Sequence, residues 1–230
     1  MKIGILCAGD SELAPFLPMI ENRRISEKAM LQIHEGTIEG VPAAALYSGV
    51  CKVNAAVAAQ ILIDSFGGTH IINAGTAGGM DGRFRIFDTV VTAETAYHDV
   101  AEDILTEFHP WLNSIWLKSD EKLIQLAEKA AEAAGHRVFF GKTVTGEQFI
   151  SDENRAAINE KFAPLTADME TAAIAHVCHL NRIPFIAVRT VTDTAEQSGV
   201  DTFERNCEKA SAIAAEIVRE MVKDSPQILT

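Results

Sequence analysis

The chain has 230 residues, of which 47% are apolar and 23% are charged, an ordinary composition for a globular protein. Its 20 Lys and Arg residues against 32 Asp and Glu residues give a formal net charge of −12. This charge would repel a polyanion, so we expect neither a nucleic acid nor an anionic membrane as partner, and a small molecule as substrate. No apolar run approaches the roughly 20 residues that span a bilayer.

The predicted elements alternate between apolar strand patterns and helical patterns along the whole chain. The predicted strands are 2–7, 31–37, 42–48, 69–74, 88–96, 137–145, 163–167 and 184–192. The predicted helices are 10–20, 52–66, 120–134, 152–161, 169–181 and 202–222. The least regular stretch, 98–118, is interpreted as an excursion from the core.

This alternation predicts one α/β domain over residues 1–230, a three-layer sandwich with a mixed, largely parallel sheet between helices. Several strands are apolar on both faces, as at Ile71-Ile72, which is typical of strands covered by helices on both sides. Ligands of such sheets bind at the carboxyl ends of the strands, so these ends are the places to look for chemistry.

Cysteines and histidines give no sign of a metal site. The four cysteines are scattered without a Cys-x-x-Cys spacing, at Cys7, Cys51, Cys178 and Cys207. Two histidines on one predicted helix, His176 and His179, lack a third ligand at zinc spacing. We therefore expect free thiols in a reducing compartment, a cytoplasmic location and no metal ion.

Two candidate segments in the first half of the chain come directly after predicted strands. Glu12 comes just after the first strand and by itself is an acidic residue in the first turn of a helix. The segment 73–79 holds three glycines in five residues, which lets a backbone approach a ligand closely. It matches neither the dinucleotide fingerprint nor the P-loop, and a plain tight turn is the alternative.

Two later segments place carboxylates at strand ends. Asp168 and Glu170 lie two residues apart, so an extended backbone would point both the same way, although helix capping also explains them. Asp193 ends the β pattern of 184–192. Partial desolvation would raise the pKa of this carboxyl and make it a proton donor near neutral pH, whereas an Asx-turn is the structural alternative.

Taken together and in order, these segments resemble one family. They are 1–12, 48–56, 72–79, 145–150, 168–178 and 188–193, and the fifth is the most specific. Over essentially its full length, the chain looks like the 5'-methylthioadenosine/S-adenosylhomocysteine nucleosidases of the nucleoside phosphorylase superfamily. The resemblance implies a nucleoside phosphorylase-like fold, hydrolysis of an N-glycosidic bond in a small nucleoside, a homodimer, and neither cofactor nor metal.

The resemblance also implies a role for each candidate residue at the base. Asp193 corresponds to the general acid at N7 of the purine, and Thr192 would orient that carboxylate. Phe149 would stack on the base, while the backbone of Ile150 reads its hydrogen-bonding edge.

On the sugar side, Glu170 corresponds to the carboxylate that holds the ribose hydroxyls, with the backbone of Met169 beside it. Glu12 would bind and deprotonate the attacking water, with Thr76 and Arg189 nearby. The remaining substrate-binding positions that the resemblance implies are Val50, Asp168 and Phe203.

Some positions depart from the family pattern. Gly9 replaces a bulkier apolar residue, Cys51 stands where Gly is usual, Glu147-Gln148 precede Phe149 where smaller residues are expected, and Asp168 replaces Glu. These departures leave open which substituent the nucleoside carries at its 5' position.

Three other functions compete with this interpretation. A nucleoside phosphorylase would use phosphate instead of water. Phosphorylases of this superfamily place an Arg next to the glycine segment, where this chain has Asn73-Ala74 and no Arg until Arg83, although Arg23-Arg24 could bind phosphate instead. A hydrolase of aminofutalosine-type nucleosides would differ only in the 5' pocket. A nucleoside-binding module without catalysis would not need all three carboxylates. For the homodimer, the stretch 111–117 and the apolar stretch after Val50 are the candidate interface segments.

Overall fold

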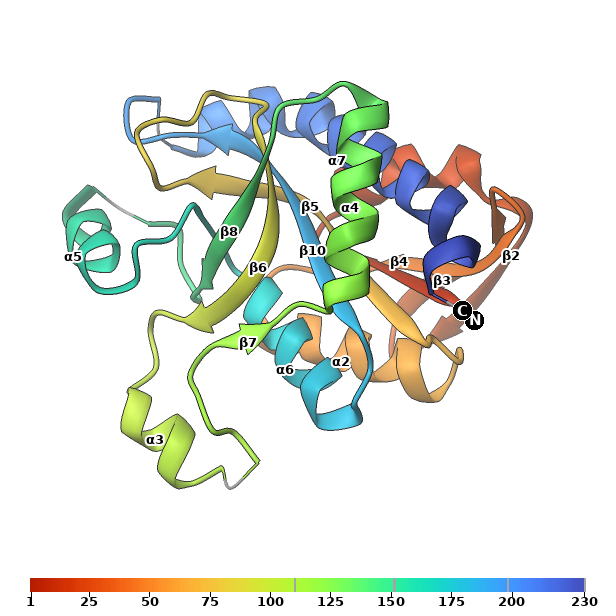
Figure 1. Cartoon of the computed structure of the whole chain (residues 1–230), viewed down its shortest axis with the longest axis horizontal. Helices are drawn as coiled ribbons and strands as arrows, with labels where there is room; N and C mark the ends of the chain where they lie inside the picture. The colour runs from red at the N-terminus through yellow and green to blue at the C-terminus, as the bar shows by residue number, and fades with distance from the viewer. Residues whose placement is uncertain (110, 151, 198, 230) are drawn as a thin grey trace.

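One sheet runs through the middle of the molecule. The structure is a computed structural model, which describes residues 1–109, 111–150, 152–197 and 199–229. The strands of these ranges are β1 (Ile3–Cys7), β2 (Glu21–Lys28), β3 (Leu31–Ile38), β4 (Val41–Tyr47), β5 (His70–Gly79), β6 (Thr89–Tyr97), β7 (Leu117–Lys118), β8 (Val138–Thr145), β9 (Thr166–Asp168) and β10 (Phe185–Asp193). All ten belong to the same sheet (Figure 1).

The pairing of the strands explains where a site can form. Strands β4, β1, β5 and β10 are neighbours in that order and run parallel. The strands β5, β10, β6, β8 and β9 pair in a closed circle, while β3 and β2 extend the other side as an antiparallel edge. The carboxyl ends of β1, β5 and β10 therefore meet at one edge of the sheet.

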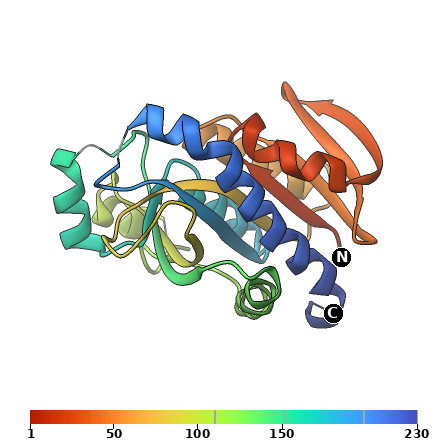
Figure 2. The ribbon, with the colours of Figure 1, turned by 90° about the horizontal axis from the view of Figure 1, so that it is seen from above.

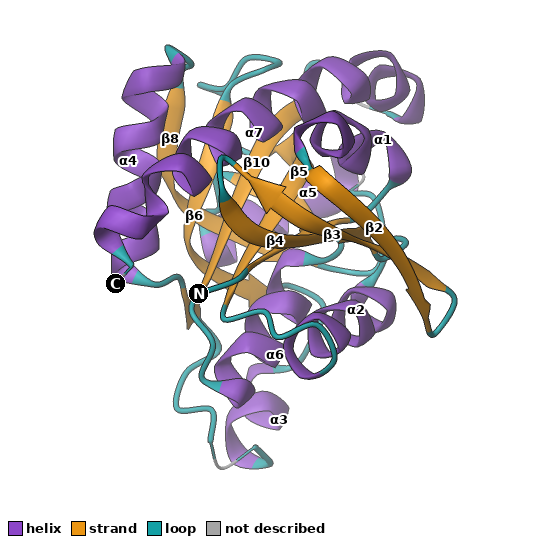
Figure 3. Cartoon of the chain, turned by 90° about the vertical axis from the view of Figure 1, so that its right-hand side faces the viewer, coloured by secondary structure: helices purple, strands orange, loops and turns teal. Residues whose placement is uncertain are grey.

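Helices cover both faces of the sheet (Figure 3). They are α1 (Asp10–Leu13), η1 (Ala14–Met19), α2 (Lys52–Asp64), α3 (Glu102–Glu107), α4 (Glu121–Ala134), α5 (Asp152–Phe162), α6 (Thr171–Asn181) and α7 (Val200–Ile228). Ile72 of β5 packs in the core with α1, α4 and α7, whereas its neighbour Ile71 packs in the core with α2 and α6. Successive side chains of a strand point to opposite faces, so two apolar residues in a row serve two cores.

The expected fold class is confirmed, and each predicted strand and helix overlaps an observed one. Figure 2 shows the long helix α7 beside α1, which it contacts. This helix is longer than the predicted 202–222. None of the helices in the described ranges combines the length and the apolar character that a membrane crossing needs.

Three sequence expectations were wrong in detail. The predicted helix 10–20 ends at Leu13 and continues as a 3-10 helix, because Pro15 and Pro18 lack the N–H that an α-helix requires. The glycine segment makes no tight turn, because β5 runs straight through Gly79. The strand β2 was not expected, because an exposed edge strand has no alternation of apolar residues to reveal it.

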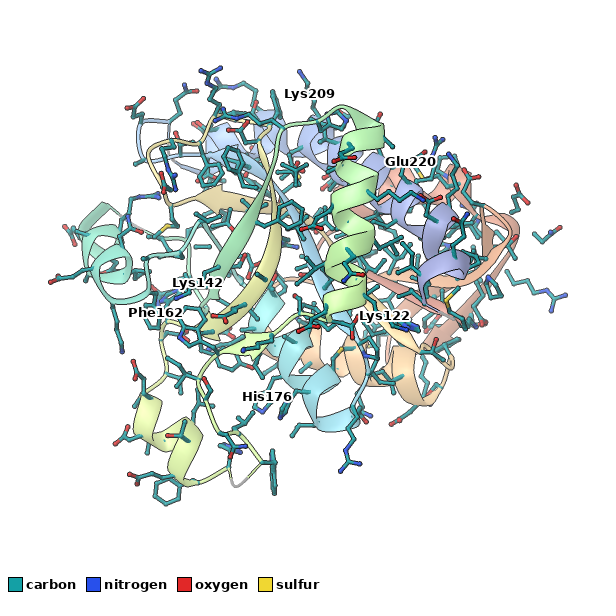
Figure 4. The ribbon with its side chains drawn as sticks, viewed as in Figure 1. Lys122, Lys142, Phe162, His176, Lys209 and Glu220 are labelled. Atoms are coloured by element: carbon teal, nitrogen blue, oxygen red, sulfur yellow. The ribbon has the colours of Figure 1, made fainter. Side chains whose placement is uncertain are left out.

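The stretch 98–118 is an excursion, as expected, and it contains the short elements α3 and β7 (Figure 1). Trp116 attaches it to the body of the protein. The Lys142 ammonium lies 4.3 Å from the centre of the Trp116 ring, and the Phe162 ring lies 6.0 Å away (Figure 4).

Candidate active site

A cavity of about 440 Å³ opens where the carboxyl ends of β1, β5, β9 and β10 meet. Its wall comes from these strand ends, from the loops after β4 and β8, and from the start of α7. The structure brings all the predicted site residues together in this wall: Glu12, Val50, Thr76, Phe149, Ile150, Asp168, Met169, Glu170, Arg189, Thr192, Asp193 and Phe203.

Glu12 is held by donors on both carboxylate oxygens. Its Oε2 accepts from the N–H of Ala8 at 2.6 Å and from the N–H of Gly9 at 3.4 Å. Its Oε1 accepts from the N–H of Thr76 at 2.7 Å and from the hydroxyl of the same residue at 2.8 Å. The side chain is only 4% exposed, so its orientation is fixed.

Gly75 makes this arrangement possible. A Cβ at this position would lie 2.4 Å from the carboxyl carbon of Glu12. The backbone of β5 can therefore approach the carboxylate only because residue 75 has no side chain. Close approach, and not a turn, explains this glycine.

Arg189 joins two carboxylates beneath the cavity. Its guanidinium is 1% exposed; Nη2 lies 3.2 Å from Oε2 of Glu170, and Nε lies 3.2 Å from Oδ2 of Asp168 in an ion pair without hydrogen-bond geometry. Burial raises the pKa of Glu170 to about 7, because the positive charge of Arg189 only partly offsets the loss of water. Glu170 thus changes its charge near neutral pH.

Asp168 also caps a helix, as its capping interpretation predicts. Its Oδ1 accepts from the N–H of Glu170 at 3.2 Å and from the N–H of Thr171 at 3.1 Å, at the start of α6. The Thr145 hydroxyl donates to the same oxygen at 2.7 Å. Capping fixes the direction in which the first turn of α6 leaves the sheet, and with it the position of Glu170.

Asp193 lines the same cavity and is the last residue of β10. The Thr192 hydroxyl donates to its Oδ1 at 2.9 Å. Burial raises the pKa of the Asp193 carboxyl, an effect that this hydrogen bond and the charge of Arg155 oppose. The carboxyl therefore retains its proton to higher pH than an exposed Asp does.

Two aromatic rings form an apolar part of the wall. The ring of Phe149, in the loop after β8, lies 5.9 Å from the ring of Phe203 on α7, at 75° to it. Phe149 is 54% exposed, so one face of its ring is free to stack on a flat ligand.

The sequence did not single out two polar groups of the site. Arg155 on α5 lines the cavity, and its guanidinium donates to the carbonyl of Gly79 at 2.8 Å; its helix is largely polar, so no pattern marks it. The peptide N–H of Cys51 donates to Oε1 of Glu170 at 3.0 Å. A backbone donor has no residue type to reveal it, although the replacement of Gly at this position was a clue.

Within the described ranges, no group of three or more His, Cys, Asp or Glu side chains is arranged to hold a metal ion. The His176 ring faces the Tyr97 hydroxyl at 3.3 Å instead. The polar groups of the cavity are carboxylates, hydroxyls and guanidinium groups, which suit acid–base chemistry on an organic ligand.

Comparison with known proteins connects this cavity to a family. The family model of the Phosphorylase superfamily matches residues 2–223. The 5'-methylthioadenosine/S-adenosylhomocysteine nucleosidase of Actinobacillus succinogenes is 35% identical over 228 residues, covering 97% of this chain and 99% of its own. The protein of that name from Bacillus subtilis is 31% identical over 229 residues, with coverage of 97% and 99%.

Solved structures agree with the sequence relatives. The Neisseria meningitidis 5'-methylthioadenosine/S-adenosylhomocysteine nucleosidase in complex with methylthio-immucillin-A superposes with a TM-score of 0.90 at 32% identity, covering 97% of this chain and 99% of that one. Futalosine hydrolase of Helicobacter pylori superposes with a TM-score of 0.89 at 26% identity, with coverage of 97% and 98%. The chain belongs to the Phosphorylase superfamily and, within it, to the 5'-methylthioadenosine/S-adenosylhomocysteine nucleosidases.

Proposed function

We propose that the protein hydrolyses the N-glycosidic bond of 5'-methylthioadenosine and S-adenosylhomocysteine, releasing adenine and the corresponding thioribose. The observation that carries the proposal is the placement of Glu12, Glu170 and Asp193 in the wall of one cavity. A buried acid and a fixed carboxylate in one cavity are the groups that such a hydrolysis needs, and the relatives above carry the name of this activity.

At the base, Asp193 donates its proton to N7 of the purine while the bond to the sugar breaks. Adenine leaves with the bonding electron pair, and the proton from Asp193 makes it a neutral leaving group. The raised pKa of the buried carboxyl supports this role, and the hydrogen bond from Thr192 orients it. Phe149 stacks on the base, and the backbone of Ile150 binds its edge.

At the sugar, departure of the base leaves a cation resembling an oxocarbenium ion. The carboxylate of Glu170 accepts hydrogen bonds from the ribose hydroxyls, beside the backbone of Met169, and its negative charge stabilises the cation. Arg189 and the capping bonds of Asp168 hold Glu170 in place. Val50 and Phe203 enclose the 5' substituent.

Glu12 takes the proton of the attacking water as the oxygen of that water bonds to the sugar. Three of its four donor contacts are between 2.6 and 2.8 Å, whereas the fourth, from the N–H of Gly9, is 3.4 Å. The weak contact leaves Oε2 free to accept a hydrogen bond from water. Thr76 keeps the other oxygen fixed.

The same contacts disfavour a phosphorylase. Backbone N–H groups that point to one place are what a bound phosphate needs, but those of Ala8 and Thr76 already bind the Glu12 carboxylate. The buried guanidinium of Arg189 is engaged by two carboxylates. Uncharged water is therefore easier to bind in this carboxylate-lined cavity than an anion such as phosphate.

An aminofutalosine-type nucleoside is the second candidate substrate. The likeness to futalosine hydrolase of Helicobacter pylori favours it, since that structure superposes almost as well as the nucleosidases do. The reaction and the roles of the three carboxylates would be the same. Only the group at the 5' position of the sugar differs.

We also propose that the protein works in the cytoplasm as a homodimer. Its four cysteines are free, as is usual in a reducing compartment. Exposed apolar side chains lie on α2, α6 and the segment after α3, which line one side of the molecule in Figures 1 and 3: Val53, Val57, Phe108, Trp111 and Leu180. A patch of this kind is typical of a surface that another protein covers.

Adenine release from 5'-methylthioadenosine, measured by HPLC with and without added phosphate, tests the proposed reaction. Methylthioribose formed in phosphate-free buffer is the expected product. Turnover only with phosphate would make the protein a phosphorylase. No release from this compound, but release from an aminofutalosine-type nucleoside, would establish the second candidate; binding of all these nucleosides without turnover would show a binding module.

A further inference from the structure

The backbone at Cys51 adopts a conformation that a residue with a side chain rarely takes. Its φ is 81° and its ψ is 161°, a region that is populated almost only by glycine. Arg182 at the end of α6 also has a positive φ, but its φ of 55° and ψ of 39° are in the ordinary left-handed region. The strain at Cys51 is therefore of a different kind.

Hydrogen bonds on both sides hold the strained residue. The peptide N–H of Cys51 donates to Oε1 of Glu170 at 3.0 Å, and the next N–H, of Lys52, donates to Oε1 of Glu147 at 3.0 Å. The carbonyl of Cys51 accepts from the N–H of Ala55 in the first turn of α2. A relaxed backbone at this residue would turn its N–H away from Glu170.

We propose that the peptide N–H of Cys51 is a positioning group for Glu170, and that the strained backbone serves to aim it at the carboxylate. Arg189 binds Oε2, and Cys51 binds Oε1, so each oxygen has one protein donor. A carboxylate oxygen has two lone pairs, which leaves one on each oxygen for a ribose hydroxyl. This inference rests on the proposed role of Glu170 in binding the sugar.

The donor also favours the charged form of Glu170. The other charged groups that face this carboxylate are Arg189 on β10, Asp168 on β9 and Glu12 on α1; only the first favours its ionisation. Loss of the Cys51 contact would therefore leave one cation against two anions and raise the pKa of Glu170.

Variants at residue 51 separate the strain from the hydrogen bond. Cys51→Gly keeps the N–H and removes the strain, so the melting temperature should rise while Glu170 titrates as before. Cys51→Val adds a β-branched side chain that this backbone does not accommodate, so the loop should relax and withdraw its N–H. Arg182→Gly is the matched control, because it relieves a positive φ at the opposite end of α6 from Glu170.

The titration of Glu170 can be followed by ¹³C NMR of its carboxyl carbon, assigned with Glu170→Gln, without any substrate. We expect Cys51→Val to raise the midpoint by half a pH unit or more and to increase KM for 5'-methylthioadenosine several-fold, with a smaller change in kcat. Cys51→Gly and Arg182→Gly should retain the midpoint of the unaltered protein. Equal midpoints in all variants would overturn the proposal.

A measurement on the unaltered protein covers the case in which Cys51→Val does not fold. The amide proton of Cys51 should lie downfield, and its shift should follow the same midpoint as the Glu170 carboxyl. In Glu170→Gln this pH dependence should vanish. An amide that ignores the titration would contradict the proposal, whereas a coupled titration in a protein that releases no adenine would refute only the proposed reaction.

Discussion

Asp193 and Glu12 are both buried, but their carboxyl groups have different hydrogen-bond donors around them. Asp193 has one side-chain hydroxyl as hydrogen-bond donor and a pKa raised by burial, whereas backbone N–H groups surround Glu12. The environment of Asp193 suits a group that donates a proton. The environment of Glu12 suits a carboxylate that is held in one orientation and accepts a proton. The proposed division of labour thus rests on the neighbours of each carboxyl and not on residue type.

Replacing the proposed acid tests this division at a single residue. Asp193→Asn should lower kcat for adenine release by about 10²–10⁴-fold, the usual contribution of a general acid, because Asn has no proton of suitable acidity. The melting temperature should change little. Asp224→Asn, which breaks a surface ion pair with Lys129, is the control and should keep full activity. A kcat within a few-fold of wild type would show that another group protonates the base.

The pKa of Glu170 predicts the acid side of the pH profile. Because this pKa is raised to about 7, the carboxylate form that accepts hydrogen bonds from ribose is lost as the pH falls below that value. We expect kcat/KM to decline between pH 7 and pH 5 by up to tenfold per pH unit. A profile that stays flat down to pH 5 would mean that ionised Glu170 is not required.

At the scale of secondary structure, the strand β5 and helix α1 approach each other through Gly75. Gly75→Ala would place a Cβ 2.4 Å from the carboxyl carbon of Glu12, and the central position of β5 prevents the strand from moving aside. We expect a loss of stability of about 1–3 kcal/mol, as for other overpacked sites, together with a large loss of kcat. Urea unfolding and initial rates measure the two effects.

Gly82→Ala provides the comparison, because no atom lies within 4 Å of a Cβ built at that position. This variant should match wild type in both measurements. If Gly75→Ala behaved in the same way, the close approach of β5 to Glu12 would be of no consequence.

The elements that sequence analysis found are those with a regular apolar pattern. Helix α7 has its stripe and β10 its continuous apolar run, so both were predicted, whereas β2 is polar along its length and was not. The glycine segment 73–79 was open to a wrong interpretation because close approach to a carboxylate and a tight turn select the same residue type.

The residues that line the cavity were expected to lie together because the motifs of one family contain them, and not because spacing required it. Local sequence gave Glu12 and Asp168 ordinary helix-end roles, and Asp168 does cap α6. No local sequence pattern shows which distant strands pair with one another. The closed circle of five strands and the contact between Cys51 and Glu170 arise only in three dimensions.

At the scale of the whole molecule, the buried His34 and the half-buried His70, His98 and His176 favour unfolding in acid. Burial lowers the pKa of His34, His70, His98 and His176. Unfolded histidines take up protons near pH 6.5, while these four stay neutral to lower pH, so the unfolded state binds more protons. These histidines should therefore lower the free energy of unfolding as the pH drops from 7 to 5, whereas Glu170, whose pKa is raised to about 7, takes up its proton in the native state and acts in the opposite direction.

Urea denaturation at pH 7.5 and pH 5.5 measures the difference in the free energy of unfolding. His34→Gln should raise the stability at pH 5.5 relative to that at pH 7.5, whereas Gly82→Ala, which alters no titratable group, should leave the difference as it is. An unchanged difference in His34→Gln would contradict the expectation.

The apolar side formed by α2, α6 and the segment after α3 predicts the state of association. Analytical ultracentrifugation should give twice the mass of the chain. Phe108→Glu places a charge in the proposed interface and should yield monomers, whereas Ile25→Glu, on the exposed edge strand β2, should not. A monomeric wild-type protein at micromolar concentration would refute the homodimer.

The carboxylates around Arg189 bear on which compounds of a cell can enter the cavity. Three negative groups, Glu12, Asp168 and Glu170, act on this single guanidinium. A nucleotide carries phosphate at its 5' position and would be repelled by their excess charge, whereas an uncharged nucleoside is not. We therefore expect the same field that would stabilise a cationic sugar to exclude adenine nucleotides, so that the enzyme leaves their N-glycosidic bonds intact.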